Sequence, residues 1–195
     1  GLFVKKGSLV DATIVESTTK PLSKKRREEL EKTPSSQIDT DADSTAKRDT
    51  KYFGYKGHIG VDMESNLIRK KTFTSARPHD SQLLGELLSG DEKAVFGDSA
   101  YGNKADKQKA RKNDVHYGIL DKATRSRKLS NTQKKNNRKK SVIRAKVEHP
   151  FAFMKTKLNY KQAVAKTLLR NELRFDMNCI LHNIFRANYL LSKQN

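Results

Sequence analysis

Two aspartates of this chain occupy positions where an ordinary surface acid is not expected. Asp11 lies inside an apolar, β-rich run from Leu9 to Val15, where a charge is costly unless it is paired or binds a metal. Asp98 follows residues 94–97 (AVFG), at the predicted carboxyl end of a strand, where ligand sites of α/β proteins gather. Taken singly, each is explained more simply as a satisfied acid in a turn or at a sheet edge.

Glu148 is more informative because of its basic surroundings. No acid occurs between Asp121 and Glu148, and the 26 intervening residues contain eleven lysines and arginines. These are Lys122, Arg125, Arg127, Lys128, Lys134, Lys135, Arg138, Lys139, Lys140, Arg144 and Lys146. A single carboxylate beside such a stretch is either a salt-bridge partner for one of them or part of a functional group of residues.

Helical spacing favours the second interpretation. Four polar residues share one predicted helical face, namely Ser141, Arg144, Glu148 and Lys155. The neighbouring stripe is apolar and is formed by Val147, Phe151, Met154 and Leu158. The helix would therefore pack on a sheet and present a carboxylate between two cations. Pro150 interrupts helical hydrogen bonding, so it predicts either a kink or a helix start at Glu148.

Three separated carboxylates with surplus cations fit phosphoryl transfer on DNA. Carboxylate oxygens are hard ligands that suit Mg²⁺. Two such ions, about 4 Å apart, can activate an attacking oxygen and stabilise a leaving one. Neighbouring arginines and lysines would hold the phosphodiester.

The elements that must position these residues are predicted from local patterns. Strands are expected at Leu9–Val15, Tyr52–Val61, Leu67–Thr74, Lys93–Asp98 and Val115–Leu120, with a hairpin turn at residues 62–66. Helices are expected at Lys24–Lys32, at residues 81–88 after an Asp80 N-cap, at Ser141–Leu158 and at Glu172–Leu191. Residues 17–50 are otherwise a predicted loop, and residues 122–140 a basic, polar segment that is flexible without DNA. Three adjacent strands followed by strand–helix alternation predict a mixed sheet with packed helices.

Composition supports a nucleic-acid partner without proving one. The 195 residues include 41 Lys and Arg against 22 Asp and Glu, a net charge of +19. Such a charge is neutralised either by a nucleic-acid backbone or within a ribosomal or similar structural assembly, and charge alone does not separate the two. The single cysteine, Cys179, excludes a disulfide framework and a cysteine-based zinc site. No apolar run is long enough to span a bilayer and no signal peptide is visible, so we expect no membrane partner and a cytoplasmic protein.

Four segments, in order, now carry a family resemblance: VDATIVE (10–16), KYFGYKGHIGVD (51–62), VFGDSAYG (95–102) and VEHPFAFMK (147–155). With them the chain resembles the DDE transposases of bacterial insertion sequences, in particular the insertion-sequence-five group within the insertion-sequence-four-like superfamily. That family's third-acid signature is Tyr, two residues, Arg, three residues, Glu, six residues, Lys. Arg144, Glu148 and Lys155 match it, whereas Ser141 stands at the Tyr position.

The resemblance implies one RNase H-like catalytic domain over residues 1–195. It implies Asp11, Asp98 and Glu148 as the catalytic triad and the ligands of Mg²⁺ or Mn²⁺. It implies DNA as partner, both transposon ends and target, with Arg144 and Lys155 near the cleaved phosphate. The basic residues Arg138, Lys139 and Lys140 are further expected DNA contacts. By family analogy we expect a homodimer on DNA that is nucleoid-associated when bound.

The beginning of the chain leaves a second hypothesis open. It starts with Gly1, almost at the first predicted catalytic strand, so the family's N-terminal DNA-binding region is expected to be absent. The alternative to an active enzyme is therefore a truncated, catalytically inactive remnant that binds DNA non-specifically. A stand-alone nuclease on the same fold is a weaker third hypothesis.

Other residues with chemical potential have simpler explanations. Asp39, Asp41 and Asp43 imitate the start of a calcium loop, but its sixth and twelfth positions do not fit, so we interpret them as a solvated loop. For His58 a packing or DNA-proximal role is favoured over metal ligation. Cys179 is expected to be buried and inert.

Overall fold

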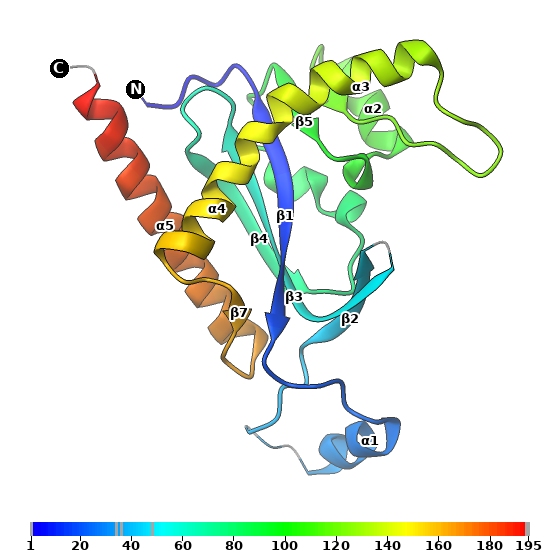
Figure 1. Ribbon diagram of the computed structural model, residues 1–195, viewed down its shortest axis with the longest axis vertical. Helices are drawn as coiled ribbons and strands as arrows, with labels where there is room; N and C mark the ends of the chain where they lie inside the picture. Colours follow the sequence, from blue (N-terminus) through cyan, green and yellow to red (C-terminus); the bar gives the residue numbers. More distant parts are fainter. Residues whose placement is uncertain (1, 34, 36, 48, 194–195) are drawn as a thin grey trace.

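A computed structural model describes residues 2–33, 35, 37–47 and 49–193 of the chain, and a mixed sheet forms its centre (Figure 1). Within these residues the sheet has seven strands: β1 (Ser8–Ser17), β2 (Asp43–Lys47), β3 (Thr50–Asp62), β4 (Ile68–Ser75), β5 (Ala94–Gly97), β6 (His116–Ile119) and β7 (Gln162–Ala163). The strand order is β2-β3-β1-β5-β6, while β4 pairs with β3 and β7 with β1. β1 pairs antiparallel with β3 and parallel with β5, so the sheet is mixed as the sequence predicted.

Helices pack on this sheet and connect its strands. They are α1 (Lys24–Lys32), α2 (Lys104–Lys112), α3 (Asn131–Arg144), α4 (Glu148–Lys157) and α5 (Leu168–Ser192). Short 3₁₀ turns are η1 (Asp80–Gln82), η2 (Leu84–Leu87), η3 (Ser99–Tyr101) and η4 (Ala145–Val147). In Figure 1, α3 and α4 follow one another across the front of β1, and α1 projects below the sheet. The arrangement confirms the predicted α/β class, with an RNase H-like mixed sheet, packed helices and a C-terminal helix.

Two apolar clusters lie on opposite faces of β1 because successive side chains of a strand point to opposite sides. One cluster contains Leu9 and Val15 of β1 and packs against Phe151 of α4 and Phe175 of α5. The other contains Val10 and packs against η2 and Tyr101. Asp11 shares the side of Leu9 and therefore faces the α4 side of the sheet.

Glycines in β3 allow elements on both faces to approach the sheet. A Cβ at Gly57 would stand 2.7 Å from the Phe175 ring of α5. A Cβ at Gly60 would stand 2.1 Å from the backbone oxygen of Leu87 in η2. The glycine-rich motif at residues 51–62 therefore serves packing on both sides of the strand that pairs with β1.

Several predicted elements differ in the structure. The helix expected at 81–88 is instead two 3₁₀ turns, and its N-cap is His79, whose ring accepts a hydrogen bond from Ser81 N. Asp80 binds Lys56 Nζ at 3.0 Å instead of capping, and Gly85 weakens any helix that would follow. Leu83, Leu84 and Leu87 are nonetheless buried, so the predicted apolar face was correct while its helix type was wrong.

The basic segment at 122–140 is also partly misassigned. Residues 131–140 belong to α3, which begins with a capping box in which Ser130 and Gln133 bond each other's backbone N–H groups. The predicted loop at 17–50 contains α1 exactly where it was expected, but also the strand β2, whose polar sequence gave no strand signal. Residues 34, 36 and 48 of that segment lie outside the described residues.

The predicted solvated loop around Asp39 is wrong for that residue. Asp39 is only 2% exposed and accepts hydrogen bonds from Tyr55 OH at 2.6 Å and from Ala42 N at 3.1 Å. Asp41 accepts from the backbone N–H of Leu168 at the start of α5. These acids are structural connections between β3, α5 and the segment before β2.

Among the described residues, no helix combines the length and apolar character needed to cross a membrane.

Candidate active site

Asp11 and Asp98 come from neighbouring parallel strands. In the register of β1 and β5, Val10 lies opposite Gly97, and each aspartate is the next residue along its strand. Asp98 directly follows β5 and caps η3 through a hydrogen bond from Ser99 N to its Oδ1. Adjacent parallel strands thus bring two carboxylates from distant parts of the sequence to one edge of the α4 side.

Glu148 reaches the same place from a helix. α3 ends at Arg144, the 3₁₀ turn η4 follows, and Glu148 is the first residue of α4. Pro150 has no N–H to donate to the carbonyl of residue 146, so an uninterrupted α-helix cannot run through this point. The single helix expected at Ser141–Leu158 is therefore divided, and of the two outcomes predicted for Pro150, a kink or a helix start, the structure shows a start at Glu148. Val147, Phe151 and Met154 are buried against the sheet, and this packing holds Glu148 above β1.

Five of the eight predicted site residues line one cleft of about 520 Å³, here named the β1 cleft. Its lining consists of Asp11, Ala12, Thr13, Ile14, Glu16, Lys47, Tyr52, Asp98, Arg144, Glu148, Phe151, Ala152 and Lys155. The structure thus brings together the three predicted acids and the two predicted cations of the family signature. Ser141 and His149, both exposed, are not among the lining residues.

Arg144 connects two of the acids. Its Nη1 donates to Asp11 Oδ2 at 3.0 Å, and its Nη2 donates to Glu148 Oε1 at 3.2 Å. Burial raises the pKa of Asp11, Arg144 and the Ala12 N–H oppose this rise, and the charges of Asp98 and Glu148 reinforce it. The net effect is a pKa above the usual value for an aspartate, and its main cause is the burial of the carboxylate.

The donor set of the β1 cleft suits a hard divalent cation. Three carboxylates from three elements supply only oxygen ligands, and their mutual repulsion at Asp11 favours a bound positive charge. As they stand, however, the described residues include no three His, Cys, Asp or Glu side chains gathered closely enough to hold one ion. The acids fit Mg²⁺ or Mn²⁺ in chemistry and share a cleft in which Arg144 occupies the space between Asp11 and Glu148.

The other predicted DNA contacts have different environments. Arg138 and Lys139 are exposed on α3, and Lys155 is exposed at the β1 cleft. Lys140 instead donates to the Ile119 carbonyl at 2.9 Å and to Asp121 Oδ2 at 3.3 Å. It therefore fastens α3 to the end of β6, and its charge is already partnered.

Sequence reasoning missed three residues of the β1 cleft: Glu16, Lys47 and Tyr52. Glu16 lies within the segment VDATIVE, but nothing in its type or spacing distinguished it from a solvated acid. Lys47 and Tyr52 flank the turn of the β2–β3 hairpin, which brings them to the cleft. Because β2 was not predicted, this hairpin could not be anticipated.

His58 and Tyr101 form a buried pair on the opposite side of the sheet. His58 is 0% exposed, and its Nδ1 lies 3.0 Å from the Tyr101 hydroxyl. Burial lowers the pKa of His58 to about 4, with a smaller raising effect of Asp80 and a lowering effect of Lys56. The packing role expected for His58 is what the structure shows, and Tyr101 belongs to the turn that follows Asp98.

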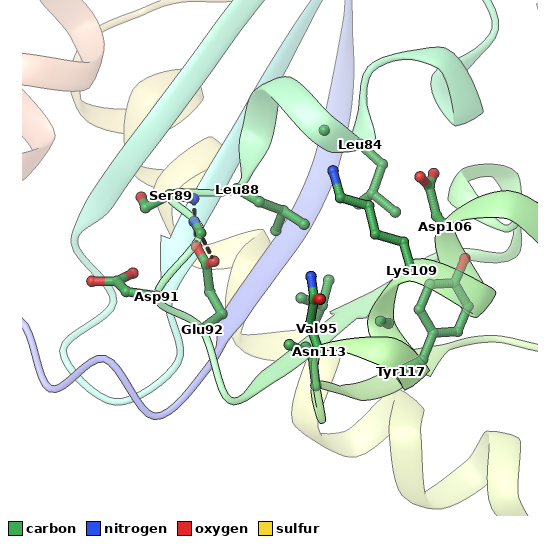
Figure 2. Close-up of a pocket in the computed structure, with 14 residues that line it drawn as sticks. Leu84, Leu88, Ser89, Asp91, Glu92, Val95, Asp106, Lys109, Asn113 and Tyr117 are labelled. Atoms are coloured by element: carbon green, nitrogen blue, oxygen red, sulfur yellow. Dashed lines mark hydrogen bonds between the residues drawn. The ribbon is translucent and has the colours of Figure 1, made fainter.

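A second cavity, of about 490 Å³, lies between the η2 segment and α2. Figure 2 shows Leu84 and Leu88 on one side and, on the other, Lys109 of α2 and Asn113, which follows that helix. The Glu92 carboxylate accepts hydrogen bonds from the backbone N–H groups of Ser89 and Gly90, at 2.6 and 2.8 Å. None of the three predicted acids lines this cavity, so the candidate chemistry remains with the β1 cleft.

Comparison with known proteins identifies the family of the chain. The family model described as transposase DDE domain matches residues 3–184. The matched range includes every residue that lines the β1 cleft. No solved structure gave a significant match to the chain.

Proposed function

The chain belongs to the transposase DDE domain family, and we propose that it cleaves and joins DNA in the transposition of a bacterial insertion sequence of the insertion-sequence-five group. Asp11, Asp98 and Glu148 are the proposed catalytic acids. The observation that carries the proposal is their presence, with Arg144 and Lys155, in one cleft built by β1, β5 and α4.

Each residue has a part in the proposed reaction. The three carboxylates would hold divalent metal, and bound Mg²⁺ or Mn²⁺ would supply activation of the attacking oxygen and stabilisation of the leaving oxygen. Lys155 and Arg144 would bind the non-bridging oxygens of the scissile phosphate. Arg138 and Lys139, exposed on α3, would contact the DNA backbone farther from the cleaved bond.

The substrates proposed are the transposon end, attacked by water, and target DNA, attacked by the 3′-hydroxyl released in the first step. No covalent link between protein and DNA is needed, because water and the 3′-hydroxyl, not a protein side chain, attack the phosphates. By analogy with other transposases, two copies would act together on paired ends at the bacterial nucleoid.

Activity on DNA tests this proposal against the alternative of an inactive remnant. The chain is incubated with Mg²⁺ or Mn²⁺ and a duplex that carries the terminal sequence of its own insertion sequence, and nicked and joined products are counted. Asp98→Asn should lower the rate on the order of a thousandfold, because a metal ligand contributes several kcal/mol to the transition state. Binding of the duplex should remain.

The matched control is Glu31→Gln, which also removes one negative charge, from an exposed position of α1. This variant should retain full activity. If Asp98→Asn cleaved and joined DNA as fast as Glu31→Gln, the assignment of the triad would be wrong. If the unaltered chain bound the duplex without cleaving it, the inactive remnant would be the correct description.

A further inference from the structure

Arg144 links a strand to a helix through two of the proposed metal ligands. It is the last residue of α3, and its two terminal nitrogens bond Asp11 of β1 at 3.0 Å and Glu148 of α4 at 3.2 Å. We call this pair of contacts the Arg144 bridge. Within the described residues, Lys155 is a second cation of the same cleft, and no ion pair is recorded for it.

The Arg144 bridge leaves the guanidinium incompletely bonded. Its side chain is 20% exposed, and its Nε is buried without a hydrogen-bond partner among the described residues. Buried donors are rarely left unpaired in proteins, because the lost hydrogen bond to water is not replaced. A phosphate accepts two parallel N–H bonds from a guanidinium, which suits Arg144 better than two separate carboxylates do.

The Arg144 bridge also uses the oxygens that a metal would need. Both oxygens of Asp11 accept a hydrogen bond, Oδ1 from the Ala12 N–H at 2.9 Å and Oδ2 from Arg144 at 3.0 Å, so a cation at Oδ2 would compete with Arg144. Glu148 offers its Oε1 to the same guanidinium. A divalent cation bound to these oxygens would be repelled by a guanidinium that shares them.

We infer that binding of metal to the acids and release of the Arg144 bridge are one coupled step, so that Arg144 becomes available to a DNA phosphate only when metal is bound. This inference rests on the proposed function. In the metal-free chain the guanidinium neutralises part of the acid cluster and holds α4 against β1. In the metal-bound chain the Arg144 side chain contacts a DNA phosphate. Metal therefore binds first and the phosphate second.

Calorimetric titration of the full chain with Mn²⁺, without DNA, tests this coupling. Arg144→Gln removes the competitor and should raise the affinity for Mn²⁺ on the order of tenfold, since two charge-assisted contacts no longer have to be broken. Lys155→Gln removes the same charge from the same cleft without breaking such contacts. It should raise the affinity by about twofold or less, because an exposed charge is screened by solvent.

A third variant keeps the charge and removes the bridging geometry. The single ammonium of Arg144→Lys cannot reproduce the planar two-sided contact, so its Mn²⁺ affinity should exceed that of the unaltered chain by about threefold or more. This variant decides the question if Arg144→Gln does not fold, as judged by circular dichroism.

The other results have definite meanings. Equal gains for Arg144→Gln and Lys155→Gln would reduce the effect to general electrostatics and overturn the coupling. A loss of affinity in Arg144→Gln would overturn it too, since Arg144 would then support the metal site. If the chain binds Mn²⁺ through Asp98 and no Arg144 variant gains affinity, the coupling alone fails. If the unaltered chain binds no Mn²⁺, the proposed metal site fails together with the coupling.

Discussion

Burial and the charge of Arg144 shift the pKa of Asp11 in opposite directions. Its strand neighbours place it between buried residues, and burial raises its pKa, while Arg144 at 3.0 Å lowers it. An isolated acid in such a place is more simply neutral or structural, which is why its surroundings in sequence left its role open. The structure adds Asp98, which follows the next strand, and Glu148 on a helix, so one partly buried acid shares a cleft with two others.

Residue types predicted the site better than they predicted its internal contacts. Arg144, Glu148 and Lys155 were expected on one helical face, and all three line the β1 cleft. The Arg144 bridge was not foreseeable, because spacing along a helix gives neighbours on that helix but not the strand residue, Asp11, that the helix covers. The contacts of Lys140 were equally unpredictable from its helix, since Ile119 ends β6 and Asp121 lies just beyond that strand.

His58 gives a prediction about pH. Burial lowers its pKa to about 4, below the usual value of 6.5, so the folded chain disfavours protonation more than the unfolded chain does. The stability that uncharged His58 contributes to the fold is therefore fully present above about pH 6.5 and is lost as the pH falls towards 4. Between pH 8 and pH 5 this loss should be about 2 kcal/mol of unfolding free energy, measured by denaturant titration.

The comparison that isolates this effect uses two substitutions. His58→Gln should flatten the decline between pH 8 and pH 5, even if it lowers stability overall. His149→Gln, at an exposed histidine, should keep the full decline. An unchanged decline in His58→Gln would mean that another group is responsible.

At the scale of elements, the break between α3 and α4 gives the site its shape. η4 and Pro150 end one helix and start the next, so that Arg144 closes α3 and Glu148 opens α4. The sequence predicted a kink or a helix start at Glu148, because a proline cannot continue helical hydrogen bonding, but it did not predict that a separate helix ends at Arg144. It did not predict that α3 extends back to Asn131, because a basic and polar sequence has no apolar stripe from which a helix can be recognised.

α3 allows a test that separates DNA contact from structural anchoring. Replacing Arg138 and Lys139 together with alanine should weaken binding to duplex DNA and lower the slope of log affinity against log salt by about 2, one unit for each lost phosphate contact. Thermal stability should not change, since both side chains are exposed and no partner is recorded for them among the described residues. Fluorescence anisotropy over a range of salt concentrations measures the slope.

Lys140→Ala should behave in the opposite manner. Loss of its contacts to Ile119 and Asp121 should lower the unfolding free energy by about 1–2 kcal/mol and leave the salt slope nearly unchanged. A lower slope with unaltered stability would instead make Lys140 a DNA contact, as its position in the basic segment had suggested.

At the scale of the whole molecule, charge and fold contribute different information. The net charge of +19 indicated a polyanionic partner but fitted structural basic proteins equally well. The order of strands and helices predicted a mixed sheet, and the seven-stranded sheet of the described residues confirms it. Strand order was not predictable from element order, because the pairing of β1 with β5 joins residues as distant in sequence as Val10 and Gly97. That pairing is what places Asp98 beside Asp11.

The central claim is that Asp11, Asp98 and Glu148 form one metal site, and the most direct test is the position of Mn²⁺ in a crystal of the chain. Anomalous scattering from crystals grown with Mn²⁺ should give density within coordination distance of the Asp11 and Asp98 carboxylates, with Glu148 contributing to the same site. The Arg144 guanidinium should then have moved off Asp11 Oδ2. Mn²⁺ bound elsewhere, with these carboxylates free of metal and the Arg144 contacts intact, would contradict the account.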